Sequence, residues 1–195
     1  MNRKKITAAV MLAAVLTGAL AGCGKGTSDN GKMAEIFTEL DTKDLEGNQV
    51  TSSIFEEKEL TMVNTWATWC GPCVSELPEL EELQKELQVE GTDVQIVGLV
   101  IGGEGSIKAG LSEEEVKEAK SVLKDTGVTY PQLEVSEKLA NTDLKDLTGL
   151  PTTYFVDQKG RMVGEPYTGS NDKEEWKKIV HKKLGELNDG KVSEK

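Results

Sequence analysis

Two cysteines stand two residues apart in the stretch NTWATWCGPCVSELP, residues 64–78. A thiol attacks a disulfide only as its thiolate, and a thiolate is stabilised at the start of a helix by unpaired backbone N–H groups and the helix dipole. A strand-like segment before Cys70 and a helical pattern after Cys73 place Cys70 at such a helix start. Cys73 lies one turn further in and is expected to be more buried. We therefore expect Cys70 to attack and Cys73 to resolve the mixed disulfide.

Three other interpretations of the pair remain open. A structural zinc ion needs four ligands, and the chain has neither a second CxxC nor a His near the pair, since its single His is His181. An inert disulfide across so short a loop stabilises a domain little. A degenerate domain could keep the motif without activity. The intact motif favours redox catalysis by the cysteines themselves, with no metal and no cofactor.

The first residues have the pattern of an export signal. Three basic residues at 3–5 precede an uncharged and mostly apolar run at 6–21, which is short for a membrane-spanning helix. The ending LAGC, residues 20–23, resembles the lipobox of bacterial lipoproteins. That resemblance implies cleavage before Cys23 and attachment of lipid to this residue. The alternatives are an ordinary signal peptide with an incidental cysteine and an uncleaved anchor.

These patterns divide the chain into four parts. We expect a lipoprotein signal peptide at residues 1–22, a flexible tether at 23–33, a folded domain at 34–188 and a disordered tail at 189–195. The chain carries 34 acidic and 23 basic side chains, a formal net charge of −11. So acidic a surface argues against nucleic acid as a partner and against charge-driven docking to anionic lipids. Membrane attachment would therefore come from the lipid on Cys23.

The hydrophobic pattern predicts an α/β domain. Strand-like segments are EIFTEL (35–40), NQVTSSIF (48–55), LTMVNTW (60–66), VQIVGLVI (94–101), TYPQLEV (129–135), and a hairpin of TTYFVD (152–157) with RMVGEPY (161–167). Helical patterns run from Cys73 to Gly91, from a capping box at Ser112 and Glu115 to Gly127, and onward from a capping box at Asn171 and Glu174. This order predicts a mixed sheet with helices on both faces.

The motifs together resemble a known family. WCGPC after a buried strand is similar to the thioredoxin-fold active site, and GLPTTYFVD at 149–157 resembles its cis-proline loop. Within that superfamily the chain is similar to the lipid-anchored TlpA/ResA-type oxidoreductases over residues 34–188, through NTWATWCGPC and the Glu-Leu-Pro after it. The resemblance implies a thioredoxin-like three-layer α/β/α sandwich with a mixed central sheet, an extended N-terminal segment, and an insertion before the cis-proline loop.

The resemblance also implies roles in substrate binding. Pro151 would be a cis proline facing the cysteines, and Leu150 would offer its backbone N–H and C=O to an extended substrate. Gly71 and Pro72 would belong to the same binding surface. Trp69, beside the cysteines, would form an apolar rim where partners dock.

Proton handling is expected to differ from that of thioredoxin. Thioredoxin has a buried Asp in the strand before its motif, whereas this chain has Asn64 there, which cannot titrate. The resemblance to ResA-like proteins points instead to Glu76, three residues after Cys73 and on the same side of the helix. Glu76 would share a proton with Cys73 through a water, and partial burial would raise its pKa. The alternative is a solvated Glu on an acidic helix. Trp66 is expected to be a core residue.

By this resemblance the chain would be a membrane-tethered thiol-disulfide oxidoreductase on the extracytoplasmic face of the cell membrane. We expect a monomeric reductase that takes electrons from a membrane thiol carrier of the CcdA/DsbD type. It would pass them to an oxidised client protein with a cysteine pair, as in cytochrome c maturation. The alternatives are a disulfide-donating oxidase, an electron relay to a peroxide- or sulfoxide-reducing partner, and a non-catalytic binding lipoprotein. A peroxiredoxin proper is not expected, because the chain has no Pro-x-x-x-Thr/Ser-x-x-Cys stretch.

Overall fold

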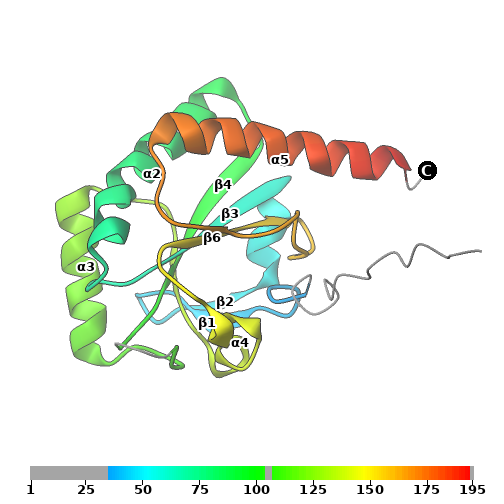
Figure 1. Ribbon diagram of the computed structural model, residues 1–195. Coiled ribbons are helices and arrows are strands. Elements are labelled where there is room, and N and C mark those ends of the chain that lie inside the picture. The colour runs from blue at the N-terminus through cyan, green and yellow to red at the C-terminus, as the bar shows by residue number, and fades with distance from the viewer. Residues whose placement is uncertain (1–34, 104–106, 194–195) are drawn as a thin grey trace, which may run out of the picture.

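The computed structural model describes residues 35–103 and 107–193 (Figure 1). The expected signal peptide, Cys23 and the tether lie outside the described residues. The described chain is built around a five-stranded sheet with the order β5-β4-β3-β6-β7. Its strands are β3 (Leu60–Trp66), β4 (Val94–Val100), β5 (Gln132–Glu134), β6 (Thr152–Asp157) and β7 (Tyr167–Thr168). β4 runs parallel to both β3 and β5, whereas β6 is antiparallel to β3 and β7, so the sheet is mixed as expected.

Helices and a hairpin cover the two faces of this sheet. Helices α2 (Gly71–Glu90) and α5 (Lys173–Ser193) lie side by side on one face, with α3 (Glu113–Thr126) next to α2 (Figure 1). The other face carries the short elements, which are β1 (Asp41–Lys43), β2 (Gln49–Thr51), η1 (Ser52–Glu57), α4 (Glu137–Ala140) and η2 (Asp143–Asp146). Strands β3, β4 and β6 are buried along their whole length, which explains their nearly continuous apolar sequences. The expected three-layer thioredoxin-like sandwich is confirmed.

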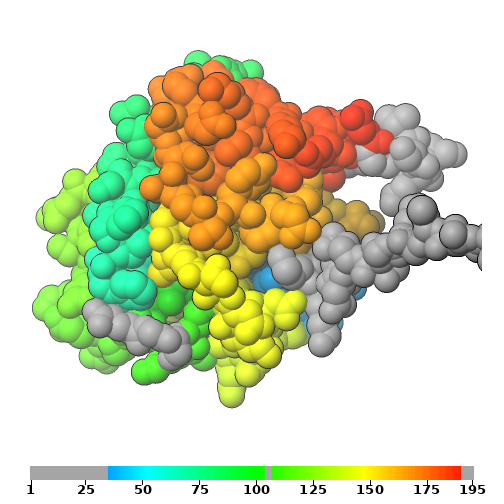
Figure 2. Space-filling model, viewed as in Figure 1, coloured from blue at the N-terminus to red at the C-terminus, as the bar shows by residue number. Residues whose placement is uncertain are grey.

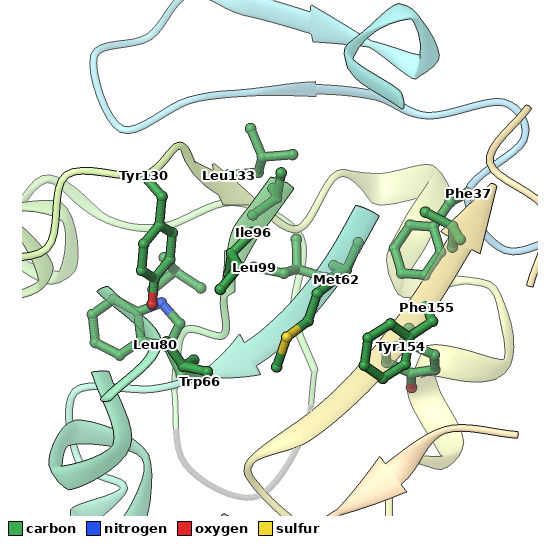
Figure 3. Close-up of a cluster of buried hydrophobic side chains, with 14 of the residues drawn as sticks. Phe37, Met62, Trp66, Leu80, Ile96, Leu99, Tyr130, Leu133, Tyr154 and Phe155 are labelled. Carbon is green, nitrogen blue, oxygen red and sulfur yellow. The ribbon is translucent and has the colours of Figure 1, made fainter. Parts of the chain in front are cut away.

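Side chains of β6 pack against the layers on both faces of the sheet. Tyr154 packs edge-to-face on Phe37 of the N-terminal segment, with ring centroids 5.4 Å apart. The next residue, Phe155, faces the opposite layer and packs near Trp176 of α5 at 6.4 Å. Figure 3 shows Phe37, Tyr154 and Phe155 within a cluster of buried side chains. Because adjacent strand residues point to opposite faces, one strand anchors both layers.

The N-terminal elements differ from the expected ones. Residues 35–39 form a turn rather than a strand, and its apolar residues Ile36 and Phe37 are buried as anchors against the sheet. The strand pair is shifted to β1 and β2, and residues 52–57 form a 3-10 helix. Asp44 fixes the hairpin turn, because its Oδ1 accepts the backbone N–H groups of Glu46 and Asn48 at 2.9 and 2.8 Å.

The return strand of the C-terminal hairpin is interrupted. Met162 makes an isolated bridge to Val156, and regular pairing resumes only at β7. Two residues between them explain the gap: Gly164 has a φ of 74°, and Pro166 has no N–H for the ladder.

The last helix begins one residue later and ends later than expected. Its first turn is capped by Asp172, whose Oδ1 accepts the N–H of Glu175 at 2.8 Å, rather than by Asn171. The helix continues to Ser193, through residues 189–193 that we expected to be disordered. Extension adds one hydrogen bond for each residue fixed, so a helix started by tertiary packing continues through polar residues. By contrast, the capping box of Ser112 and Glu115 on α3 is confirmed in both of its hydrogen bonds. No helix among the described residues has the length and apolar character needed to span a membrane.

Candidate active site

The two cysteines sit at the junction of β3 and α2, where the sequence places them. β3 ends at Trp66, the N–H of Cys70 bonds to the C=O of Ala67 at 3.1 Å, and the helix starts at Gly71. Pro72 lies in the first helical turn, where a missing N–H costs nothing. Cys70 is therefore the N-cap residue of α2. It forms a disulfide with Cys73, with the two Cα atoms 5.3 Å apart.

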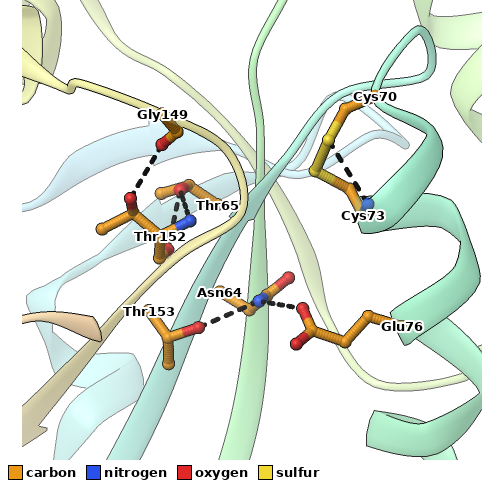
Figure 4. The surroundings of a disulfide bond; sticks show 8 residues. All are labelled: Asn64, Thr65, Cys70, Cys73, Glu76, Gly149, Thr152 and Thr153. Atoms are coloured by element: carbon orange, nitrogen blue, oxygen red, sulfur yellow. Dashed lines mark hydrogen bonds between the residues drawn. A yellow bond between two sulfur atoms is a disulfide. The ribbon is translucent and has the colours of Figure 1, made fainter. Parts of the chain in front are cut away.

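The two sulfur atoms have different surroundings. Cys70 is 7% exposed and contributes to the wall of a surface cavity, whereas Cys73 is 1% exposed and does not. The N–H of Cys73 points at the Sγ of Cys70, at 3.3 Å (Figure 4). After reduction, this N–H and the positive end of α2 can stabilise a thiolate on Cys70. The geometry thus gives an accessible sulfur for attack and a shielded one behind it.

A cavity of about 470 Å³, which we call the Cys70 groove, opens beside the accessible sulfur. Its first wall is residues 69–72, its second is Ile101, Gly103 and Ile107, and its third is Lys145 with residues 147–150. In Figure 2 the start of α2 (teal) and the segment before β6 (yellow) border one another at the surface. Trp69 is 46% exposed at the rim, as expected. The sequence-predicted residues Trp69, Gly71, Pro72 and Leu150 therefore meet in one groove.

The loop before β6 has the expected proline geometry. The Leu150–Pro151 bond is cis, and the buried Pro151 lies directly behind the groove-lining Leu150. The C=O of Pro151 is occupied by the N–H of Gly169 at 2.9 Å. Within the described part of the chain, neither the N–H nor the C=O of Leu150 has a hydrogen-bond partner. Both groups are thus available to an extended polypeptide laid along this edge.

Threonines that the sequence analysis missed hold this loop against β3. The Oγ1 of Thr65 accepts the N–H of Thr152 at 3.1 Å and donates to its C=O at 2.7 Å. The hydroxyl of Thr152 in turn donates to the C=O of Gly149 at 2.8 Å (Figure 4). The two contacts between Thr65 and Thr152 join residues that are far apart in the sequence. Only the β3–β6 register, which the hydrophobic pattern does not give, brings them together.

Glu76 is a buried carboxyl group, 2% exposed, on the inner face of α2. Its Oε2 accepts the side-chain N–H of Asn64 at 3.1 Å (Figure 4). Its Oε1 accepts the backbone N–H of Asn171 and the indole N–H of Trp176, each at 2.8 Å. Burial raises the pKa of Glu76, and these three hydrogen bonds only partly offset that effect. The solvated alternative for Glu76 is therefore wrong.

Asn64 joins Glu76 to the sheet. Its second side-chain N–H donates to Thr153 Oγ1 at 3.0 Å, and its own Oδ1 is buried with no partner among the described residues. The sequence analysis missed Trp176 and Asn171, since no pattern links the start of α5 to Glu76. Trp66 is a core residue as expected: it is fully buried, and its indole N–H donates to Gln132 Oε1 at 2.8 Å. No cluster of three or more His, Cys, Asp or Glu suited to a metal ion occurs in the described ranges.

Comparisons with known proteins agree with this geometry. Residues 31–164 match the model of the AhpC/TSA family. The chain is 31% identical to the thiol:disulfide interchange protein DsbE of Haemophilus influenzae over 157 residues, covering 78% of this chain and 74% of that protein. It is 26% identical to the thiol-disulfide oxidoreductase ResA of Bacillus subtilis over 140 residues, covering 72% of this chain and 68% of ResA.

A solved structure has the same fold. It is a thiol:disulfide interchange protein of the thioredoxin family from Chlorobium tepidum TLS, which superposes with a TM-score of 0.58 at 25% identity. The superposition covers 75% of this chain and 93% of that protein. A second, StoA from Bacillus subtilis, superposes with a TM-score of 0.54 at 20% identity, over 72% of this chain and 95% of StoA.

Proposed function

Since this chain belongs to the AhpC/TSA family and is a thiol-disulfide oxidoreductase of the DsbE/ResA type, we propose that it acts as a reductase of protein disulfides. The observation that carries the proposal is the pairing of an accessible Cys70 with a shielded Cys73 at the start of α2. A buried carboxyl group, that of Glu76, lies one helical turn beyond Cys73. When Glu76 is ionised, its negative charge disfavours a neighbouring thiolate, so it favours the disulfide form of the pair and makes the dithiol the better reductant.

The proposed reaction is two successive thiol-disulfide exchanges. The Cys70 thiolate attacks one sulfur of a client disulfide, and the client's other sulfur leaves as a thiolate that takes up a proton. Cys73 then loses its proton and attacks the Sγ of Cys70. The Cys70–client bond breaks and releases the second client thiol. Two electrons pass to the client, and Cys70 and Cys73 end as the internal disulfide.

Glu76 is proposed to handle the proton of Cys73 in the second exchange. Its raised pKa brings a carboxyl group closer to the pKa of a thiol, which is what proton transfer between the two requires. Asn64, the backbone of Asn171 and Trp176 fix the orientation of its carboxyl group. Glu76 would thus serve in place of the titrating Asp that thioredoxin has at the position of Asn64.

The direction of electron flow is tested by the reduction potential of the Cys70–Cys73 pair. The protein is equilibrated with defined ratios of oxidised and reduced dithiothreitol, and its free thiols are then alkylated and counted by mass spectrometry. We expect a potential near that of thioredoxin, about −270 mV. A value of about −120 mV, typical of dedicated oxidases, would instead support the disulfide-donating alternative. Cys73→Ser, which cannot form the internal bond, is the control that must show no transition in this range.

We further propose that lipid on Cys23 tethers the protein to the extracytoplasmic face of the membrane. There a membrane thiol carrier would supply electrons, and the reduced domain would reach a client with an oxidised cysteine pair. The support is the basic start, the apolar run and the LAGC ending at residues 20–23. The test is to express the protein in a bacterium grown on labelled palmitate and to measure the label on the purified protein. We expect the wild type and the control variant Ser28→Ala to carry the label, and Cys23→Ala to carry none. Label retained in Cys23→Ala would show that Cys23 is not the lipid site.

A further inference from the structure

The Cys70 groove has a charge pattern unlike that of the rest of the protein. The chain as a whole carries 34 acidic residues and a formal net charge of −11. Among the described residues that line the groove there is no Asp or Glu, and Lys145 is the one charged side chain. The other side chains on its walls include Trp69, Ile107 and Leu147, which are apolar. Among the described residues, a surface with one positive charge and no carboxylate thus lies next to the reactive sulfur.

Lys145 lacks the carboxylate partner that most of the lysines with described side chains have. Ion pairs within 4 Å occupy ten of the described lysines, which are Lys58, Lys85, Lys117, Lys120, Lys138, Lys173, Lys177, Lys178, Lys182 and Lys183. Lys145 is exposed and makes no side-chain hydrogen bond or ion pair with any described residue. Its ammonium group is therefore free to bind an external anion.

Trp69 lines two hollows that differ in charge. A second hollow, which Trp69 lines but Lys145 does not, contains Glu115 and Glu118. A client carboxylate would be repelled there and attracted at Lys145, so charge favours the Cys70 groove over this second hollow. The groove also carries the unpaired N–H and C=O groups of Leu150, along which an extended segment can lie.

We propose that the preferred clients present their reactive cysteine within an extended segment that also carries an acidic side chain, which pairs with Lys145, and an apolar side chain, which packs on Ile107 and Leu147. This proposal rests on the reductase function above and adds the chemistry of the substrate. The charge argument rests on Lys145, which is the one charged side chain among the described residues of the groove and would attract an anion in so acidic a protein. Apolar contact and backbone pairing supply the remaining binding.

The test uses synthetic peptides with one cysteine, an adjacent leucine and a mixed disulfide to 2-mercaptoethanol. The peptides form three sets, which carry Glu, Gln or Lys as a single variable residue. Within each set, this residue is placed in turn at each of the three positions on either side of the cysteine. The protein is reduced with dithiothreitol, freed of it, and mixed with each peptide at physiological salt, where long-range charge effects are screened. The exchange breaks the peptide's disulfide and leaves the peptide and mercaptoethanol as thiols and the protein oxidised.

For wild type we expect the rate with Glu to exceed the rate with Lys by about fivefold at the best position, the size of a local ion pair. In Lys145→Glu we expect this ratio to invert to about one fifth. Taking the ratio within one protein cancels any general change in activity. The matched control is Lys159→Glu, which changes the net charge equally in the exposed turn after the far end of β6 and should keep the wild-type ratio.

Two failures are distinguishable. If wild type reduces none of the peptides, the reductase function itself is wrong. If wild type reduces them all but no position shows a preference for Glu, or if Lys145→Glu and Lys159→Glu change the ratio alike, the function stands and the inference about the client is overturned. A concentration-dependent dimer that Lys145→Glu disrupts in sedimentation would assign the groove to a second copy of the chain and would also overturn it.

Discussion

Replacing Cys70 with serine is expected to abolish disulfide exchange, with a residual rate lower than wild type by about three orders of magnitude or more. A serine hydroxyl does not ionise at neutral pH, and the shielded Cys73 is poorly placed to replace the lost nucleophile because it is 1% exposed and does not line the groove. The measurement is the single-turnover rate with a small neutral disulfide, recorded at matched protein concentrations.

The matched variant is Cys73→Ser, which keeps the nucleophile and removes the resolving thiol. It should react once and then accumulate a mixed disulfide on Cys70, visible as a stable mass increase. The asymmetry of burial makes these two variants behave oppositely. If Cys70→Ser accumulated the mixed disulfide and Cys73→Ser did not, the two roles would have to be exchanged.

Replacing Glu76 with alanine is expected to destabilise the oxidised protein by about 3 kcal/mol, measured as the free energy of unfolding in urea at neutral pH. The substitution leaves three donors without this acceptor: the buried side-chain N–H of Asn64, the buried indole N–H of Trp176 and the partly buried backbone N–H of Asn171. An unpaired buried donor costs about 1–3 kcal/mol, and the cost of ionising a buried carboxyl group, which alanine removes, offsets part of the sum.

Glu76→Gln separates the charge of Glu76 from its shape. The pKa of Glu76 is raised in the folded protein, so the folded state holds this proton more tightly than the unfolded chain does. The stability that the group contributes is fully present below its unfolded pKa and is lost as pH rises through the folded pKa. The stability of wild type relative to Glu76→Gln should therefore fall as pH rises across that window. A pH-independent difference would show that Glu76 does not titrate there.

The same variant tests the link to the cysteines. An ionised Glu76 beneath the pair raises the pKa of a neighbouring thiol, so in reduced Glu76→Gln we expect thiolate to form at lower pH than in wild type. Alkylation rates followed over a pH series measure this directly. Titration curves that superimpose would leave Glu76 a structural residue that holds α5.

Local signals predicted the parts of this site that lie close together in the sequence. Cys70 could be placed at a helix start because strand-forming residues end at Trp66 and Pro72 suits a first helical turn. The capping box at Ser112 was predicted correctly for the same reason, since all its contacts lie within four residues. The cis Leu150–Pro151 bond followed from resemblance rather than from any physical property of GLPTTYFVD.

Contacts between distant segments could not be predicted from the sequence patterns. Asn171 and Asp172 are both good N-cap residues, each with a Glu three positions later, and local sequence does not choose between them. In the fold, the N–H of Asn171 bonds to Glu76, and Asp172 caps the helix. Likewise, the partner of Thr65 depends on the register of β3 against β6. Such features are set by packing, which the linear pattern does not specify.

The meeting of Glu76 with Asn171 and Trp176 has a consequence for how the protein is made. The chain is synthesised from its N-terminus, so residues 70–76 emerge long before residues 171–176, which supply two of the three donors to Glu76. Until then, Asn64 is the one of these three donors that has been synthesised. A nascent chain can already contain both cysteines, yet the set of donors that holds Glu76 is complete only when residues 171–176 have been made.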